Sequence, residues 1–304
     1  MTSSAPSGAL DALIDPDTPL EKLADGFWFT EGAAWSAKRN ELIFSDIPRD
    51  VRWRWTEKDG LERVISPNFK GNGTVFEEDG SLLVCEQVTS CVTRFKPDGG
   101  HEVVAFQYEG KYLNSPNDIV VKSDGSIWFT DPNYGRWDGP FGLGRECDLD
   151  FQGVYRMERD GSDLTLVVEK TEFQQPNGLC FSPDESILYV NDSPAGELKA
   201  FEVRPDRTLG PARLIHSGID RRETREGTAD GMKCDEHGNV WCTGPYGVWV
   251  ISPAGELLGI YRVREIVGNL VWGGDDLKTL FLNASDTLYS VRTNVRAGWL
   301  PSHR

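Results

Sequence analysis

Residues 228–244 of the chain read TADGMKCDEHGNVWCTG, and this stretch contains the unit from which most of the sequence is built. A polar residue and a glycine, Asp230 and Gly231, precede a short apolar run, a polar turn and a second run rich in β-branched and aromatic residues. This order predicts two β-strands joined by a tight turn.

The same order of residues recurs along the chain. There are six copies, the last of them weaker, and they begin at residues 31, 72, 117, 177, 230 and 268. Their spacing is roughly the period of propeller blades. Because one hairpin cannot bury its own apolar face, the copies have to pack around a common axis. The sequence therefore predicts an all-β fold, a six-bladed β-propeller.

The repeats occupy most of the 304 residues and leave no room for a second core. We expect one propeller domain, the catalytic domain, over residues 20–304. A flexible N-terminal tail is expected over residues 1–19, where Pro16 and Pro19 disfavour regular structure. The β-compatible run over residues 20–29 is expected to add an outer strand to the last blade and to close the ring.

The charge and the cysteine content of the chain limit which binding partners and which cellular location we expect. A formal net charge of -16 argues against nucleic acid and anionic membranes, which both need a basic surface. The chain starts without a signal-like segment and has no apolar window of transmembrane length. The six cysteines lack metal-ligand spacing and fit reduced thiols in a cytoplasmic protein, although Cys85 and Cys91 could approach each other. Monomer and homodimer both stay open.

The residue just before the first strand of each copy carries the candidate chemistry. In chain order this column reads Glu31, Asn72, Asn117, Asn177, Asp230 and Gly268. Since the first strand of a propeller blade lines the central channel, we expect these side chains to form a ring at one mouth. Five of the six offer the oxygen donors that hard divalent cations prefer. Two carboxylates in a narrow channel would repel each other unless a cation lay between them.

Turn chemistry is the alternative explanation of the column, because Asn and Asp before Gly are ordinary turn residues. Glu31 does not fit it, since Glu is a poor turn former, whereas Asn72 fits either explanation. Further polar residues follow the second strands and return to the same mouth, as turn and cap residues or as groups that bind a polar substrate: Glu86, Asp131, Asn133, Tyr134 and Asp192. Asp118 is expected to be a structural turn residue.

Five short motifs resemble those of the gluconolactonase, regucalcin (senescence marker protein) and luciferin-regenerating enzyme family. They are Thr30-Glu31-Gly32, Ser115-Pro116-Asn117-Asp118, Thr130-Asp131-Pro132-Asn133-Tyr134-Gly135, Gln175-Pro176-Asn177-Gly178 and Ala229-Asp230-Gly231. The resemblance covers nearly the whole chain and is strongest to the bacterial gluconolactonase branch. One position departs from the animal members, which have Arg where this chain has Ser115.

The resemblance implies a six-bladed propeller with one divalent metal ion in the channel, which could be calcium, zinc, magnesium, manganese or iron(II). It implies metal ligation by Glu31, Asn177 and Asp230, with Asn117 beside the metal. The implied reaction opens gluconolactone-type sugar lactones to aldonic acids, as in a carboxylic-ester hydrolase of carbohydrate metabolism. The metal would polarise the lactone carbonyl and Asp230 would act as general base.

The candidates for substrate binding are Asn117, Asn72, Glu86, Asn133 and Tyr134. The insert over residues 132–152, with Trp137, Phe141 and Arg145, is long enough to be a lid over the channel. None of the four histidines belongs to the column, which argues against a histidine dyad or a histidine-rich zinc site.

Two other functions stay open. A related propeller that cleaves fluorophosphates has a similar Glu/Asn/Asn/Asp channel, so a phosphotriesterase-like hydrolase is one alternative. A non-enzymatic metal-binding propeller is the other, although such a protein would not need converging carboxylates.

Overall fold

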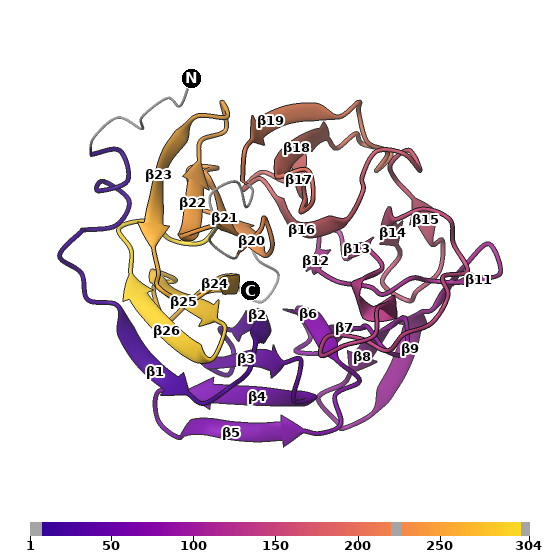
Figure 1. Cartoon of the computed structure of the whole chain (residues 1–304), viewed down its shortest axis with the longest axis horizontal. Coiled ribbons are helices and arrows are strands. Elements are labelled where there is room, and N and C mark those ends of the chain that lie inside the picture. Colours follow the sequence, from indigo (N-terminus) through magenta and orange to yellow (C-terminus); the bar gives the residue numbers. More distant parts are fainter. Residues whose placement is uncertain (1–7, 220–226, 299–304) are drawn as a thin grey trace.

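The computed structural model describes residues 8–219 and 227–298. Six four-stranded antiparallel sheets stand around a central axis like the blades of a propeller (Figure 1). The prediction of an all-β, six-bladed propeller is confirmed. Within the described residues, no helix is long and apolar enough to cross a membrane.

The blades follow one another in chain order, and each strand lies next to the one that follows it in the sequence. Blade one consists of β2 (Thr30–Ser36), β3 (Glu41–Asp46), β4 (Val51–Thr56) and β5 (Gly60–Ile65). Blade two consists of β6 (Gly71–Phe76), β7 (Leu82–Glu86), β8 (Cys91–Phe95) and β9 (His101–Ala105). Blade three consists of β12 (Ile119–Val121), β13 (Ile127–Asp131), β14 (Gly153–Met157) and β15 (Thr165–Leu166).

The second half of the ring repeats this order. Blade four consists of β16 (Pro176–Phe181), β17 (Ile187–Asp192), β18 (Glu197–Glu202) and β19 (Arg213–Ser217). Blade five consists of β20 (Met232–Cys234), β21 (Val240–Gly244), β22 (Gly247–Ile251) and β23 (Leu257–Arg262). Blade six contains β24 (Val267–Gly273), β25 (Thr279–Ala284) and β26 (Thr287–Arg292).

The ring is closed by the N-terminal part of the chain. The fourth strand of blade six is β1 (Glu21–Asp25), which pairs antiparallel with β26 from Glu21 opposite Ser290 to Asp25 opposite Thr287. The expected outer strand in the last blade is therefore confirmed. Closure of this kind removes the unpaired sheet edge that a linear array of blades would leave.

Residues 8–14 differ from the expected flexible tail. Leu13 and Ile14 are buried in an apolar cluster with residues of blades five and six, among them Val263 and Val295. Residues 8–14 form turns and no strand, yet turns allow apolar side chains to pack against the blades. Residues 1–7 lie outside the described part.

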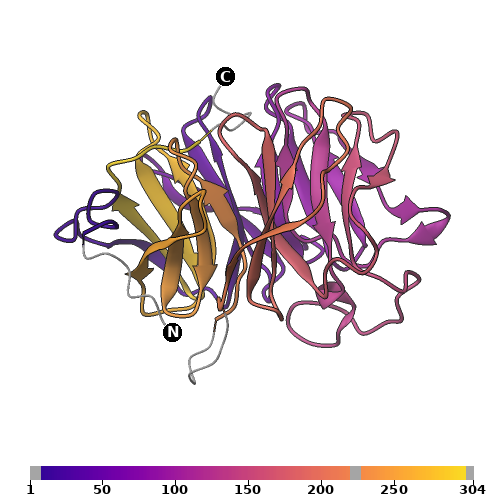
Figure 2. The ribbon, with the colours of Figure 1, turned by 90° about the horizontal axis from the view of Figure 1, so that it is seen from above.

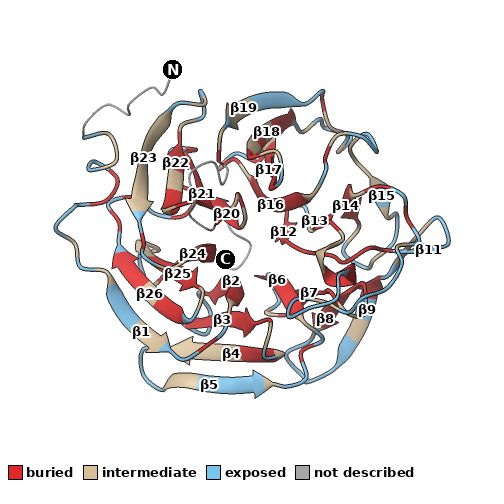
Figure 3. Cartoon of the chain, viewed as in Figure 1, coloured by how far each residue is buried: buried red, intermediate tan, exposed pale blue. Residues whose placement is uncertain are grey.

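Burial decreases from the axis to the rim of each blade (Figure 3). Every residue of β2 and β24 is buried, whereas β5 and β19 contain exposed and half-buried residues and none that is buried. Large aromatic side chains fill the wedges between neighbouring blades, as the rings of Trp241 in blade five and Trp272 in blade six show, at 5.2 Å and in an edge-to-face arrangement. Such pairs stabilise the fold by about 0.5–1.5 kcal/mol beyond the contribution of the area that they bury.

Two small elements interrupt the regular blades. A hairpin of β10 (Gln107–Tyr108) and β11 (Lys111–Tyr112) projects from the rim, at the right in Figures 1 and 2. A short 3₁₀ helix, η1 (Tyr134–Arg136), opens the insert that follows β13.

Much of the acidity of the chain serves the turns between strands. In a recurring turn an aspartate carboxylate accepts a hydrogen bond from the backbone N–H two residues later, which fixes the turn locally. The aspartates that do this include Asp79, Asp98, Asp124, Asp160, Asp184, Asp206 and Asp235.

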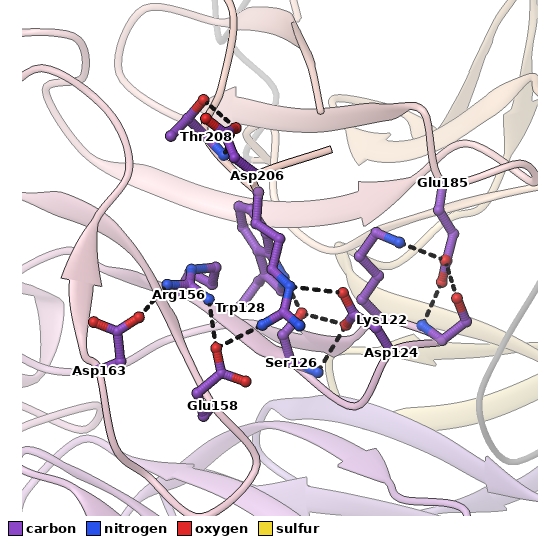
Figure 4. A network of polar contacts seen from close by, with 12 residues as sticks. Lys122, Asp124, Ser126, Trp128, Arg156, Glu158, Asp163, Glu185, Asp206 and Thr208 are labelled. Atoms are coloured by element: carbon purple, nitrogen blue, oxygen red, sulfur yellow. Dashed lines mark hydrogen bonds and ion pairs between the residues drawn. The ribbon is translucent and has the colours of Figure 1, made fainter. Parts of the chain in front are cut away.

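Blades three and four are joined by a network of charged groups (Figure 4). The buried carboxylate of Glu185, in blade four, accepts hydrogen bonds from the Lys122 ammonium at 2.9 Å and from the Ser123 backbone N–H at 2.7 Å. Arg207 of blade four contacts Glu158 at 2.5 Å and Asp124 at 3.0 Å, both in blade three. Hydrogen bonds to charged groups are worth about 1.5–3 kcal/mol each when one partner is removed.

Replacement of Glu185 by alanine is expected to lower the free energy of unfolding by about 2–3 kcal/mol, because it leaves the Lys122 ammonium and the Ser123 N–H without their partner. Denaturant unfolding of both proteins measures the difference. Glu62→Ala is the control, since the Glu62–Arg54 pair is exposed and should contribute less than about 0.5 kcal/mol. Equal losses in the two variants would contradict a linking role for Glu185.

Candidate active site

The inner strands β2, β6, β12, β16, β20 and β24 contact one another in a complete ring around the axis. Backbone hydrogen bonds connect their first residues directly, from Gly73 N–H to the Asn117 carbonyl at 2.7 Å and from Gly231 N–H to the Gly268 carbonyl at 2.9 Å. The residues of the column therefore start strands that meet at one end of the axis.

The glycines of the motifs have a role at this ring rather than in turns. A Cβ atom on Gly32 would lie 1.9 Å from the Asn72 carbonyl oxygen, and one on Gly178 would lie 2.2 Å from that of Asp230. On Gly73 it would lie 2.4 Å from the Asn117 carbonyl oxygen. Glycine is needed because the backbone of the next inner strand passes too close for a side chain.

Carboxylates at the ends of the second strands hold the loops that lead into the inner strands. Asp46 accepts hydrogen bonds from the backbone N–H groups of Trp28 and Phe29, just before Glu31. Asp131 does the same for Asn114, and Asp192 for Gln174 and Gln175, just before Asn177. Both Asp131 and Asp192 are therefore cap residues in this structure, one of the two roles that the sequence left open.

Glu31, Asn177 and Asp230 come together, as the sequence predicts. The carboxyl of Asp230 lies within hydrogen-bonding reach of the Glu31 carboxyl and the Asn177 amide. Burial and the nearby Glu31 and Asp118 charges raise the pKa of Asp230 well above its usual range. Burial raises the pKa of Glu31 to about 7, against the opposing effect of its hydrogen bond from Asn269.

The donors of this cluster suit a hard divalent cation. Asn177 donates from Nδ2 to the Ser193 hydroxyl at 3.0 Å, while its Oδ1 atom is buried without a hydrogen-bond partner. An amide with an unpaired buried oxygen, gathered with two carboxyls that disfavour each other's ionisation, is a set that a cation would complete. No three His, Cys, Asp or Glu side chains of the described residues gather in one group, so the set is two carboxyls and an amide oxygen.

Two polar residues of the ring do not belong to the column, because each stands one position after a column residue. Asn269, next to Gly268, donates from Nδ2 to the Glu31 carboxylate at 2.8 Å. Asp118, next to Asn117, accepts hydrogen bonds from Ile119 N–H at 2.9 Å and Leu179 N–H at 3.3 Å. Both are buried. They occupy the position that is glycine in the other four copies, and this was the available signal.

The candidates for substrate binding differ in how free their polar atoms are. The side-chain amides of Asn72 and Asn117 have no hydrogen-bond partner among the described residues, although both residues are largely buried. The amide oxygen of Asn133 accepts from Gln175 Nε2 at 2.7 Å. The Tyr134 hydroxyl lies within hydrogen-bonding reach of Ser193 and Asn177, close to the charge of Asp230.

Glu86, at the end of β7 and paired with Gly71 next to Asn72, already has hydrogen-bond partners. Its Oε2 atom accepts hydrogen bonds from the Thr89 hydroxyl at 2.8 Å and the Cys91 thiol at 3.4 Å, within its own blade. All six cysteines are free, and Cys85 and Cys91 do not pair. The described histidines lie outside the ring, His101 and His216 on outer strands and His237 in a turn.

The insert over residues 132–152 is fixed at both of its flanks. Arg136 donates to the carbonyl oxygens of Asn114 and Glu146, and Arg145 donates to the Ser90 hydroxyl at 2.7 Å. Between them Phe141 contacts Phe29, two residues before Glu31, with the ring centroids 5.2 Å apart. The insert therefore reaches from blade three to the start of blade one, at the end of the axis where Glu31 lies.

Comparison with known proteins agrees with this arrangement. A family model described as the SMP-30/gluconolactonase/LRE-like region matches residues 29–286. The chain is 31% identical to the gluconolactonase of Zymomonas mobilis, over 94% of this chain and 85% of that protein. It is 26% identical to the diisopropyl-fluorophosphatase of Loligo vulgaris, over 60% of this chain and 59% of that protein.

Solved structures give the same picture. XC5397 from Xanthomonas campestris, described as a gluconolactonase, has a TM-score of 0.86 and 32% identity, over 95% of this chain and 93% of that one. Regucalcin from Agrobacterium tumefaciens, described as a calcium-binding protein, has a TM-score of 0.75 and covers 94% of this chain and 98% of its own. At 17% identity the second likeness is one of fold alone.

Asp131 gives the structure a pH dependence that can be measured. Burial raises the pKa of its carboxyl to about 7, despite the N–H groups that it caps. The unfolded value is about 4, so between about pH 4 and pH 7 the folded state binds more protons and stability falls as the pH rises. We therefore compare the free energy of unfolding of Asp131→Asn with that of the wild type. The difference, variant minus wild type, should increase by about 2–3 kcal/mol from pH 5 to pH 8.

Denaturant unfolding of the wild type and Asp131→Asn at both pH values measures this shift. Asp138→Asn, in an exposed part of the same insert, is the control and should leave the pH dependence unchanged. Parallel stability curves for the wild type and Asp131→Asn would show that Asp131 is ionised over the whole range.

Proposed function

The chain belongs to the SMP-30/gluconolactonase/LRE-like family, and we propose that it is a metal-dependent lactonase that opens sugar lactones of the gluconolactone type to aldonic acids. It is a hydrolase of the lactone-opening, carboxylic-ester class, as its gluconolactonase relatives indicate. One observation supports the metal dependence: the buried carboxyl of Asp230 gathers with the Glu31 carboxyl and the Asn177 amide, and the Oδ1 atom of that amide has no hydrogen-bond partner.

Glu31, Asn177 and Asp230 would hold the divalent cation, whose identity among calcium, zinc, magnesium, manganese and iron(II) stays open. When bound, it would supply Lewis-acid polarisation of the lactone carbonyl. Asn269 orients Glu31 through its 2.8 Å hydrogen bond, and Ser193 orients the Asn177 amide at 3.0 Å. These hydrogen bonds fix the side chains of Glu31 and Asn177 before a cation binds, so that little side-chain freedom would be lost on binding.

Asp230 is the proposed general base. Burial and the Glu31 and Asp118 charges raise its pKa, so its carboxylate is a stronger base than an exposed one and can take a proton from the attacking water and return it to the ring oxygen that leaves. The free amides of Asn72 and Asn117 can pair with lactone hydroxyls, since each offers one acceptor and two donor sites. The Tyr134 hydroxyl and Asn133 lie on the neighbouring insert, where they can contact the same substrate.

A phosphotriesterase-like reaction is the second candidate, because the chain is also similar to a diisopropyl-fluorophosphatase. In that reaction a carboxylate attacks phosphorus and one of its oxygens leaves with the product. A single turnover in ¹⁸O-labelled water separates the two routes. The label enters the protein in the carboxylate route and enters only the product when water attacks directly.

Replacement of Glu31 by glutamine or of Asp230 by asparagine should lower kcat/KM for gluconolactone by at least about 10²-fold, because each removes a charged donor and Asp230→Asn also removes the base. The assay is pH-stat titration of the acid released, with metal-free protein reconstituted with each cation in turn. Calorimetric titration of the same cations should show weakened binding in both variants.

Glu41→Gln is the matched control, since Glu41 is equally buried but lies at the opposite end of blade one, paired with Arg39. It should keep cation binding and turnover. Normal turnover in Asp230→Asn, or activity that survives complete removal of metal, would contradict the proposal.

Phe141→Ala tests whether the insert acts as a lid. Loss of the Phe29–Phe141 contact should free the middle of the insert and raise KM several-fold more than it lowers kcat, because substrate would be held less well. Steady-state kinetics over a series of lactones measures both constants. Phe106→Ala, at an exposed aromatic residue on the rim, is the control and should change neither. Unchanged kinetics in Phe141→Ala would exclude a lid.

A further inference from the structure

The other half of the axis contains a cavity that the proposed reaction does not use. All six inner strands line it with residues that follow the ring, such as Ala34, Val75, Val121 and Val271, and Ala297 closes one side. Almost every lining residue is apolar. Lys233, on β20, is the one charged residue among the described residues of this lining.

Lys233 is a buried lysine without a carboxylate partner in the described part of the chain. It is 7% exposed, and its ammonium donates one hydrogen bond, to the Met232 carbonyl at 3.1 Å. Lysine is rarely buried unless paired, because removing an ammonium from water costs several kcal/mol. Some other interaction therefore has to compensate its charge.

The compensating charges lie at the ring, next to the cavity. Ile119 lines the cavity, and its backbone N–H binds the Asp118 carboxylate, so Asp118 lies at the border between cavity and ring. Asp230 precedes Lys233 by three residues, which places their Cα atoms roughly 10 Å apart in an extended chain. The positive charge of Lys233 favours the ionised forms of both Glu31 and Asp118, the pKa values of which it lowers against burial.

Counting these buried charges gives a simple result. Glu31, Asp118 and Asp230 carry three negative charges when ionised, and Lys233 carries one positive charge. With all three carboxyls ionised, this set has a surplus of two negative charges, which one divalent cation would neutralise. In an interior of low dielectric constant, a neutral set is strongly favoured over one with a net charge.

We propose that Lys233 is the fixed internal counter-charge of the site, and that it tunes the site to a divalent cation. It is a positioning residue for charge, not a ligand and not a catalytic residue. Its ammonium weakens cation binding by repulsion, which keeps the cation exchangeable, and it offsets the carboxylates when no cation is bound. This inference rests on the proposed metal site.

Replacement of Lys233 by methionine tests the proposal, because methionine fills similar space without charge. At about 10 Å and an effective dielectric constant of about 20–40, loss of one positive charge should tighten binding of a dication by between about tenfold and a few hundredfold. Isothermal titration of metal-free protein with calcium and with manganese measures this. The preference for a trivalent lanthanide such as terbium over calcium should also rise, since the surplus becomes three negative charges.

Two controls isolate the charge. Lys233→Arg keeps the charge and should keep the wild-type affinities, while Lys58→Met removes a fully exposed positive charge and should change affinity less than about twofold. If Lys233→Met does not fold, Lys233→Gln is measured in the same way. Weakened or unchanged dication binding in the neutral variants would overturn the proposal and leave Lys233 as a structural side chain.

The outcome also separates this inference from the proposed function. Wild-type protein that binds no dication at all, or whose binding is untouched by Glu31→Gln, would overturn the metal site and this inference together. Wild-type binding that Glu31→Gln abolishes and Lys233→Met does not tighten would overturn the role of Lys233 alone.

Discussion

The site depends on hydrogen bonds between carboxylates at the outer ends of second strands and the backbone of the loops that enter the inner strands. Asp46, Asp131 and Asp192 perform this task in blades one, three and four. Each loop ends one to three residues before a member of the ring, so its position decides where that side chain points. A charged acceptor binds backbone N–H groups about twice as strongly as a neutral one. Strand pairing within each blade and the buried carboxylates that bind the entering loops therefore fix the position of the ring together.

Glycine at the start of the inner strands is the second requirement for the same geometry. Neighbouring inner strands approach so closely that a Cβ atom on Gly32, Gly178 or Gly231 would collide with the next strand. Where the glycine is absent, at Asp118 and Asn269, the side chain lies in the space that an adjacent glycine leaves free, that of Gly73 and Gly231 respectively. Close approach of the strands therefore concentrates polar groups at one end of the axis. The negative charge of these groups favours positive charge nearby, from Lys233 or from the proposed metal ion.

The repeated local pattern was sufficient for the blade number and for placing Glu31, Asn177 and Asp230 at one end of the axis. The closing strand followed from the β-compatible run over residues 20–29, which precedes the first copy. The sequence could not decide whether Asp131 and Asp192 bind substrate or cap loops, since a cap is defined by a backbone N–H from another segment. Asn269 was missed because the column was read at one position only. The packing of Leu13 and Ile14, and the isolation of Lys233 among apolar side chains, depend on contacts between distant blades that no local pattern contains.

Closure of the ring by β1 has a consequence for the order in which the molecule can be assembled. Glu31 follows β1 by six residues, and Asn269, which orients it, belongs to the blade that β1 completes. The ribosome makes Glu31 long before Asn269, so the nascent chain cannot form the hydrogen bond between them until blade six has been made and has met β1. The polar cluster around Glu31 and the seam of the propeller are therefore completed in the same step of folding.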